Sequence, residues 1–262
     1  MQAALRFCAN LKWLFTELPF GQRFAAAAQA GFTAVEYAAP YDFPAADQRR
    51  WLSQQGLQLQ LINTPVGPAG SLSSAGQACH PQRTNAFRRD IIRAINYASA
   101  LSCPMIHVQA GVLPAGVTHQ QAFDTLCENL QMAAGLAASH DITLLLEAIN
   151  HYDIPAYFLQ TQAESLAVIQ QVNTGNLRLL FDIYHCQRTE GDVSGRLAEF
   201  WPWIRHIQVA DTPLRGEPGS GDIDWPALFS QLRSLNYHGR IGCEYRPSAG
   251  TIAGLGWINS YR

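Results

Sequence analysis

Short apolar runs alternate along the chain with longer segments in which apolar residues recur every three or four positions. This alternation predicts strands joined by helices, as in a parallel sheet built from βα units. Eight runs have strand character: 5–10, 34–37, 57–63, 105–109, 143–149, 177–182, 206–210 and 240–244. Seven segments have helical periodicity: 19–30, 44–55, 83–101, 119–139, 162–172, 193–201 and 225–235.

The number of strands favours one closed barrel. Eight strands in 262 residues give one unit per roughly 33 residues, close to a (β/α)₈ barrel of about 250 residues. No linker or shift in composition divides the chain, so we predict a single TIM-barrel domain over 1–262. The alternative is a doubly wound open sheet, which usually has a glycine-rich first turn; the first turn here, ANLKWLFTE, contains no GxGxxG.

One segment interrupts the alternation. Residues 64–80, TPVGPAGSLSSAGQACH, are rich in Gly, Ser, Ala and Pro. Long loops of this kind are often active-site lids. We therefore predict a lid over the mouth of the barrel, with an ordinary surface loop as the alternative.

Composition narrows the class of protein. Hydrophobic residues make up 48% of the chain, and 18 Lys and Arg face 20 Asp and Glu for a net charge of −2. This balance predicts a globular protein that does not bind nucleic acid. No apolar run reaches the roughly 20 residues of a membrane span, and the first residues do not resemble a signal peptide, so we expect a cytoplasmic protein. Composition leaves a homo-oligomer open.

The six cysteines show no CxxC spacing, so the sequence indicates neither a zinc ribbon nor a redox pair. We expect most of them to be small buried apolar residues. Cys186 lies beside the candidate site and could instead be a nucleophile, although no sequence signature supports that interpretation.

Every predicted strand ends with a polar residue. The carboxyl ends of barrel strands meet at one rim, where barrel enzymes build their active sites. Four of these residues come from strands five to eight, and each offers a side-chain oxygen. The polar ends are Asn10, Glu36, Asn63, Gln109, Glu147, Asp182, Gln208 and Glu244.

The oxygen donors of strands five to eight predict a metal site. Carboxylates embedded in runs such as LLLEAIN and LLFDIYH need a partner, a proton or a cation. No matching cluster of Lys or Arg accompanies them, and hard oxygen donors favour Mg²⁺ or Mn²⁺ over zinc. We predict Glu147, Asp182, Gln208 and Glu244 as the ligands; the alternative is that they cap strands or pair with arginines at the rim.

The histidines near the strand ends have different predicted roles. His185, three residues after Asp182, would leave the strand and reach over the mouth, where it would bind substrate or serve as a structural hydrogen-bonding residue. His107 and His206 fall within predicted strands. We expect both to be packed or hydrogen-bonded in the interior.

The loop after strand seven, DTPLRGEPGSGDIDW, carries a candidate substrate group. A fixed guanidinium at Arg215 suits a small carboxylate or phosphate substrate, and Arg246 competes for this role. Backbone N–H groups of Gly216, Gly219 and Gly221 could also cradle an anion, although ordinary turns explain these glycines equally well.

This set of residues predicts enolisation chemistry. A hard cation withdraws charge from a carbonyl and acidifies the neighbouring C–H, so that one carboxylate can remove the proton. Glu147 and Glu244 are the predicted acid/base pair. Such a site interconverts an α-hydroxy aldehyde and an α-hydroxy ketone through an enediolate, with no nicotinamide, flavin or other nucleotide cofactor.

Several long blocks resemble one known family. They are RFCANLKWLFTELPFGQRFAAAAQAGFTAVEY, EAINHYDIPAYFLQ, FDIYHCQRTEGD, HIQVADTPLRGEPGSGDIDWPALF and IGCEYRPSAGTIAGLGW. Together they resemble the hydroxypyruvate isomerase family of the xylose-isomerase-like TIM barrels. The resemblance implies a metal-assisted isomerase of the aldose–ketose type that converts hydroxypyruvate to 2-hydroxy-3-oxopropanoate (tartronate semialdehyde) in glyoxylate metabolism.

The resemblance also implies residue roles. Glu147 and Glu244 look like the family's proton-transfer pair and are metal ligands as well, while Asp182 and Gln208 look like the other two ligands. Substrate-facing positions are His185, Arg215 and Asp153; the last could also simply fix its turn.

Two departures affect the expected substrate. The chain has GPAGSLSSAG where similar sequences carry a GDWAAGERG-like stretch, and CEYRP where they carry CEYKP. The 2-oxo-tetronate isomerases, which act on four-carbon acids, are similar in most of the same blocks, although INHYDIPAYFL looks more like the hydroxypyruvate branch. More remote alternatives are a metal-dependent endonuclease on the same fold and a noncatalytic sugar-acid-binding protein.

Overall fold

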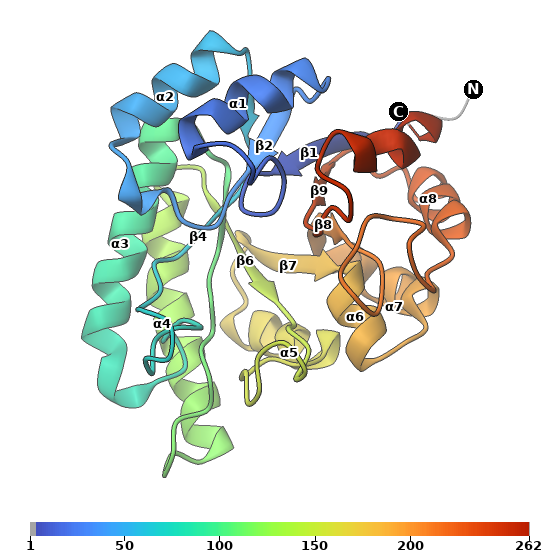
Figure 1. Cartoon of the computed structure of the whole chain (residues 1–262). Coiled ribbons are helices and arrows are strands. Elements are labelled where there is room, and N and C mark those ends of the chain that lie inside the picture. Colours follow the sequence, from blue (N-terminus) through green and yellow to red (C-terminus); the bar gives the residue numbers. More distant parts are fainter. Residues whose placement is uncertain (1–3, 262) are drawn as a thin grey trace. The chain divides into compact units, whose positions relative to one another are not determined.

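The computed structural model describes residues 4–261 (Figure 1). The chain forms two compact units. The first comprises Met1–Tyr37, Ala46–Gln60 and Phe181–Arg262, and the second comprises Ala38–Ala45 and Leu61–Leu180. Each unit contains a parallel sheet with helices.

Five strands form the sheet of the first unit. Their order is β3 (Gln58–Leu59), β2 (Ala34–Glu36), β1 (Arg6–Asn10), β9 (Arg240–Cys243) and β8 (Ile204–Val209). All pairs in this order are parallel. Both Cys8 of β1 and Gln208 of β8 are in register with Gly242 of β9. These three residues therefore form one row across the sheet.

Aromatic packing fixes the helices of the first unit to its strands. Phe229 stacks on Trp257 at 5.9 Å and meets the edge of the Phe7 ring at 5.8 Å. At the other side of this unit, Phe24 packs on Trp51 at 5.4 Å. The helices are α1 (Phe20–Gln29), α2 (Ala45–Gln54), α6 (Ile183–Thr189), α7 (Val193–Phe200) and α8 (Trp225–Ser234), with 3₁₀ turns at Trp201–Trp203 and Ala253–Ser260.

The second unit has a sheet of the order β4 (Ile62–Asn63), β5 (Met105–His107), β6 (Thr143–Glu147) and β7 (Leu177–Asp182), of which residues 177–180 belong to this unit. Its strands are also parallel. One buried cluster consists of Leu61, Met105, Leu145 and Leu180.

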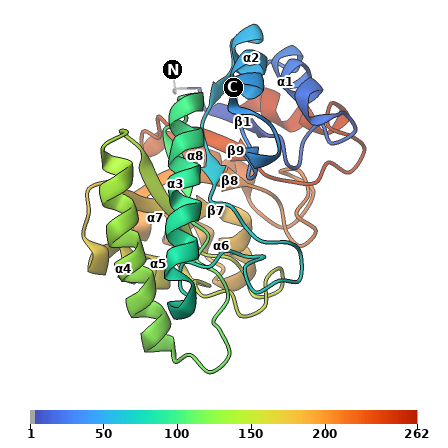
Figure 2. The same cartoon turned by 90° about the vertical axis from the view of Figure 1, so that its left-hand side faces the viewer.

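Three long helices accompany this sheet: α3 (Thr84–Leu101), α4 (His119–Ala138) and α5 (Gln162–Val172). Two shorter 3₁₀ turns lie at Pro40–Asp42 and Pro81–Arg83. Helices α3 and α4 lie side by side (Figures 1 and 2). Capping boxes begin α4 at Thr118 and α5 at Thr161, so that side chains satisfy backbone N–H groups at both starts.

The structure confirms all seven predicted helices to within two residues at each end. Two details of the prediction were wrong. The third strand run, 57–63, divides into β3 and β4, which belong to different units. Helix α6 was not predicted, because it is only seven residues long and begins directly after the last residue of β7.

Residues 64–80 contain no helix or regular strand, and their two halves differ. Residues 75–79 are buried, and Cys79 N donates to Ala110 O at 2.8 Å. Asn129 Nδ2 donates to Ala78 O at 2.7 Å. Most of 65–74 is exposed or half-buried, and its role as a lid stays a prediction.

Among the described residues, none of the helices has the length and hydrophobicity of a membrane span.

Candidate metal-binding and proton-transfer site

Asp182 is a buried carboxylate at the end of β7. It is also the N-cap of α6, where its Oδ1 accepts a hydrogen bond from Tyr184 N at 2.8 Å. Its Oδ2 accepts one from Arg215 Nη2 at 3.1 Å. Burial raises the pKa of Asp182 to about 7; Arg215 lowers it and Glu244 raises it further. The local protein charges therefore only partly compensate for burying this carboxylate.

Arg215 holds two carboxylates of the first unit together. Its Nη2 atom also lies 3.6 Å from Glu244 Oε2, and its Nε donates to the Glu244 carbonyl at 3.3 Å. The guanidinium lies between two aromatic rings, 4.9 Å from the centroid of Trp13 and 4.8 Å from that of Tyr184. Stacking of this kind suits the planar guanidinium and fixes its position.

Asp211 shapes the loop that carries Arg215. It is fully buried, and its carboxylate accepts hydrogen bonds from the backbone N–H groups of Thr212, Gly219 and Ile223 and from the Trp225 indole, at 2.8–3.2 Å. The N–H of Gly219 thus binds a carboxylate of the protein itself. At Gly219 the structure therefore favours an ordinary turn, and not the binding of a substrate anion that the sequence left open.

Glu244 directly follows β9 and is only partly buried. Its Oε1 accepts a hydrogen bond from Trp13 Nε1 at 2.9 Å. One oxygen is therefore fixed by an indole, and the other faces Arg215. Trp13 was not among the predicted site residues, because its partner lies 231 residues away along the chain.

His185 lies in α6, beyond the end of β7 as predicted, and is buried; that it reaches over the barrel mouth stays a prediction. Its Nε2 is 3.2 Å from Arg215 Nη1. Because a guanidinium can only donate, this Nε2 is the acceptor, and the ring carries its proton on Nδ1. The 3.7 Å separation between His185 Nε2 and Asp182 Oδ2 is accordingly no hydrogen bond.

Gln208 offers a buried side-chain oxygen. The side chain is buried in β8, and its Nε2 donates to Glu36 Oε1 at 2.8 Å. Among the described residues, no hydrogen bond reaches its Oε1. A buried amide oxygen is costly without a partner, and a cation is one such partner.

Two of the predicted site residues, Glu147 and Asp153, lie in the second unit. Glu147 ends β6 and is buried, with its Oε2 atom 3.3 Å from His107 Nδ1. Asp153 is exposed in a turn, where its N–H and that of Tyr152 donate to Asn150 Oδ1. The prediction that His107 is an interior residue is confirmed. The roles of Glu147 and Asp153 stay predictions.

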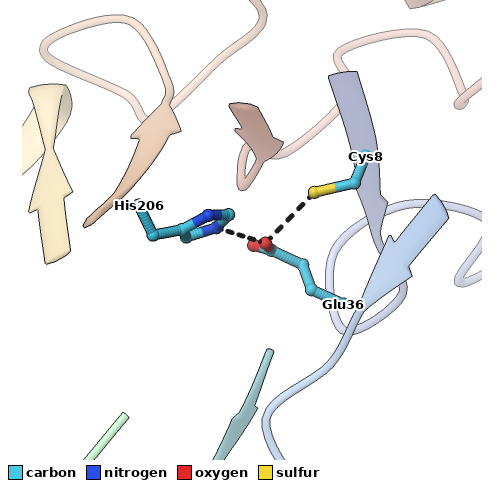
Figure 3. Close-up of side chains that lie close together, drawn as sticks. All are labelled: Cys8, Glu36 and His206. Atoms are coloured by element: carbon cyan, nitrogen blue, oxygen red, sulfur yellow. Dashed lines mark hydrogen bonds and ion pairs between the residues drawn. The ribbon is translucent and has the colours of Figure 1, made fainter. Parts of the chain in front are cut away.

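Three side chains elsewhere in the first unit, Cys8, Glu36 and His206, are close enough to one another to hold a metal ion (Figure 3). Their geometry is that of hydrogen bonds. His206 Nε2 is 2.7 Å from Glu36 Oε2, whereas two ligands of a tetrahedral zinc ion lie roughly 3.4 Å apart. Burial also raises the pKa of the Cys8 thiol well above its ordinary value, which opposes the thiolate that a metal needs. His206 is thus a hydrogen-bonded interior residue, as predicted.

The cysteines are all free, and five of the six are buried. Burial also raises the pKa of the Cys186 thiol, and the nearby Glu190 adds to that effect. The expectation of small buried residues is confirmed for all but the partly buried Cys127.

The chain belongs to the xylose isomerase-like TIM barrel family, whose family model matches residues 24–261. This match confirms the predicted (β/α)₈ fold class. The chain is 44% identical over 256 residues to the 2-oxo-tetronate isomerase of Cupriavidus necator, covering 98% of each protein. It is 42% identical over 258 residues to the hydroxypyruvate isomerase of Escherichia coli K12, covering 98% of this chain and all of that protein. The chain is thus an isomerase of this family.

Solved structures show the same architecture. A crystal structure from Brucella melitensis, described as an AP endonuclease of family 2, has a TM-score of 0.94 and 38% identity, covering 98% of this chain and 99% of that one. The 3-keto-D-glucoside 4-epimerase of E. coli has a TM-score of 0.80 at 20% identity, covering 98% of this chain and 100% of that one. The second likeness concerns the fold alone.

Proposed function

We propose that this isomerase interconverts hydroxypyruvate and 2-hydroxy-3-oxopropanoate by moving a proton between two neighbouring carbons. A proton leaves C3 of hydroxypyruvate, an enediolate forms, and C2 receives a proton, while the hydroxyl proton passes from O3 to O2. The observation that carries this proposal is the arrangement around Glu244, a partly buried carboxylate oriented by Trp13 and close to Arg215.

The residues of the first unit fit a divalent cation. Asp182 is a buried carboxylate whose pKa is raised by burial to about 7, and Gln208 Oε1 is buried without a partner among the described residues. With Glu244, and with Glu147 from the second unit, they form the proposed ligand set for Mg²⁺ or Mn²⁺. When bound, the ion would polarise the substrate carbonyl and acidify the neighbouring C–H.

In this proposal, Glu244 and Glu147 transfer the protons. The Trp13 indole fixes one oxygen of Glu244, which leaves the other for proton transfer. Glu147 has this role by its place at the end of β6 and by the family resemblance of LLLEAIN. In each direction one carboxylate accepts the proton that leaves carbon, and the other carboxyl group supplies the proton that the neighbouring carbon receives.

Arg215, His185 and Asp153 are the proposed substrate-binding residues. Arg215 contacts Asp182 and Glu244, and its guanidinium places a positive charge beside them that suits a substrate carboxylate. Arg246 is exposed and lies 5.1 Å from the Trp13 ring, where it could supply a second positive charge. A substrate with a carboxylate suits this charge better than a neutral sugar does.

The decisive experiment follows both substrates by proton NMR in D₂O. Hydroxypyruvate and a 2-oxo-tetronate are each given to the metal-loaded enzyme, and EDTA is then added. We expect turnover of hydroxypyruvate, with deuterium entering at carbon, to stop with the chelator. Glu244→Gln should abolish exchange, whereas the exposed Glu199→Gln of α7 should retain it. Exchange that survives EDTA would refute the metal role.

The first alternative is a 2-oxo-tetronate isomerase, since the relatives of that name and of the hydroxypyruvate name are about equally similar. Turnover of the four-carbon acid alone would keep the mechanism and change the substrate. The second alternative is an endonuclease, as the Brucella structure is described. The net charge of −2 disfavours it, and cleavage of abasic duplex DNA would overturn the proposed isomerisation.

A further inference from the structure

Glu36 is a fully buried carboxylate that four side chains contact. Its Oε1 accepts hydrogen bonds from Asn10 Nδ2 at 2.9 Å and Gln208 Nε2 at 2.8 Å. Its Oε2 accepts them from His206 Nε2 at 2.7 Å and Cys8 Sγ at 3.3 Å (Figure 3). Four donors around one carboxylate compensate for the cost of burying it.

The strands of the first unit leave room for this carboxylate at one point. Gly242 of β9 is in register with Cys8 of β1 and Gln208 of β8. A Cβ atom at Gly242 would lie 2.3 Å from Glu36 Oε1, closer than real atoms approach. The missing side chain therefore makes the space in which Glu36 reaches Gln208.

The contact with Glu36 determines which way the Gln208 amide faces. A carboxylate accepts hydrogen bonds and has none to donate, so it must meet the NH₂ end of the amide. Oε1 then points away from Glu36, and no described residue donates to it. The Asn10 amide is oriented in the same way, because its Oδ1 accepts from Lys12 N at 3.1 Å while its Nδ2 donates to Glu36.

We propose that Glu36 is a positioning residue that presents Gln208 Oε1 as a ligand to the divalent cation. The proposal rests on the function proposed above, which makes Gln208 a metal ligand. Glu36 itself touches neither substrate nor metal in this scheme. Partners that orient a metal ligand typically change metal affinity 10–100-fold when they are replaced.

The test is a double-mutant cycle on Mn²⁺ affinity, measured by calorimetry on the metal-free full-length protein. Glu36→Gln keeps the size of the side chain but leaves one acceptor oxygen for four donors, so the Gln208 amide must compete for the group that now orients it. We expect Mn²⁺ binding to weaken about 10–100-fold. If Glu36 acts through Gln208, adding Glu36→Gln to Gln208→Ala should weaken binding no further.

Cys8→Ala is the matched control, because Cys8 donates to the other oxygen of the same carboxylate. We expect its Mn²⁺ affinity to stay within about twofold of the unmodified protein, since the Gln208 bond is intact. Additive losses in the Glu36→Gln and Gln208→Ala pair, or an equal loss in Cys8→Ala, would overturn the positioning role.

The cycle separates the two proposals. Normal Mn²⁺ binding by Gln208→Ala would remove Gln208 from the ligand set and overturn the positioning role, whereas the proposed isomerisation is tested separately by the exchange experiment. Weak binding by Gln208→Ala with normal binding by Glu36→Gln would overturn the positioning role alone. If circular dichroism shows that Glu36→Gln does not fold, Glu36→Asp takes its place in the cycle. The aspartate keeps the charge, but its side chain is one methylene shorter and so places the carboxylate farther from Gln208. Unchanged affinity in Glu36→Asp would also overturn the role.

Discussion

Arg215 serves the candidate site as an internal positive charge. Its guanidinium contacts Asp182 and Glu244, two of the proposed ligands, and is held between the rings of Trp13 and Tyr184. This charge stabilises the carboxylates before a cation binds, and it repels the cation afterwards. We therefore expect this side chain to influence metal affinity as well as substrate binding.

Replacing Arg215 should make metal binding tighter and catalysis slower. In Arg215→Met the carboxylates lose their competing positive charge, so we expect Mn²⁺ affinity to rise on the order of tenfold. The Michaelis constant should rise as well, because the proposed substrate contact is lost. Calorimetry and steady-state kinetics measure the two effects. Arg246→Met is the control, with unchanged metal affinity; weaker Mn²⁺ binding by Arg215→Met would show a purely structural role.

The cysteines should react slowly with alkylating reagents. Burial raises the pKa of the partly buried Cys127 to about 11, above the ordinary 9.0, and Asp124 and Glu128 add to the effect. Since the thiolate is the reactive form, iodoacetamide should label Cys127 slowly at pH 8. Below that pKa, the rate of labelling should rise about tenfold for each unit by which the pH is raised. Mass spectrometry of the native protein should find Cys127 labelled first. Fast labelling of Cys186 with loss of activity would revive its role as a nucleophile.

Candidate site residues could be predicted where the neighbouring sequence shows that a polar side chain ends a buried strand. Asp182 and Gln208 were identified because each ends an apolar run. The pairs that orient them were not predictable, because their members lie far apart in the sequence. Glu36 is 172 residues from Gln208, and Arg215 is 33 from Asp182. No local pattern indicates which distant donor a buried carboxylate will meet.

At the level of helices and strands, local signals predicted most of the structure. The capped helices α4 and α5 begin at the residues where the sequence placed them. Helix α6 has fewer than two turns, so its apolar residues cannot show a helical period. The run 57–63 gave no sign of its division into β3 and β4, because an apolar run looks the same whether or not the chain changes strand partners.

Close packing at β9 should make Gly242 sensitive to substitution. Gly242→Ala would place a Cβ atom against the Glu36 carboxylate, which is itself fixed by four donors. We expect a loss of roughly 1–3 kcal/mol in the free energy of unfolding, as for other overpacked interiors. Urea denaturation followed by circular dichroism measures it.

Gly135→Ala is the opposite case. Gly135 lies within α4 and a Cβ atom there meets nothing within 4 Å, so alanine should stabilise the protein by roughly 0.5–1 kcal/mol. If Gly242→Ala were as stable as the unmodified protein, Glu36 would have to move aside easily. That result would contradict a rigid contact between Gly242 and Glu36.

For the whole molecule, sequence and family define the type of enzyme more sharply than its substrate. Relatives of 44% and 42% identity carry different substrate names, so overall similarity does not decide between three and four carbons. These acids differ by one hydroxylated carbon, which only the few groups around the substrate can distinguish. From the sequence we expect this chain to depart from similar sequences in the stretch 67–76 and at Arg246. We therefore expect substrate choice to depend on residues for which the family pattern gives no prediction.

Metal binding should stabilise the whole chain. A ligand that binds only the folded state at about 100 times its dissociation constant adds roughly 2.7 kcal/mol. For a chain of this size, each kcal/mol of stabilisation raises the melting temperature by about 2–4 °C. Saturating Mn²⁺ should therefore raise the melting temperature by roughly 5–11 °C over that of an EDTA-treated sample. Differential scanning calorimetry measures the shift.

Asp182→Asn should abolish this rise without removing the start of α6. Its side-chain oxygen can still accept the Tyr184 N–H, so the cap is kept, while the charge that attracts the cation is lost. Glu199→Gln changes an exposed carboxylate on α7 and should show the full rise. A full rise in Asp182→Asn would contradict its role as a ligand, because the stabilising ion would then bind through other groups.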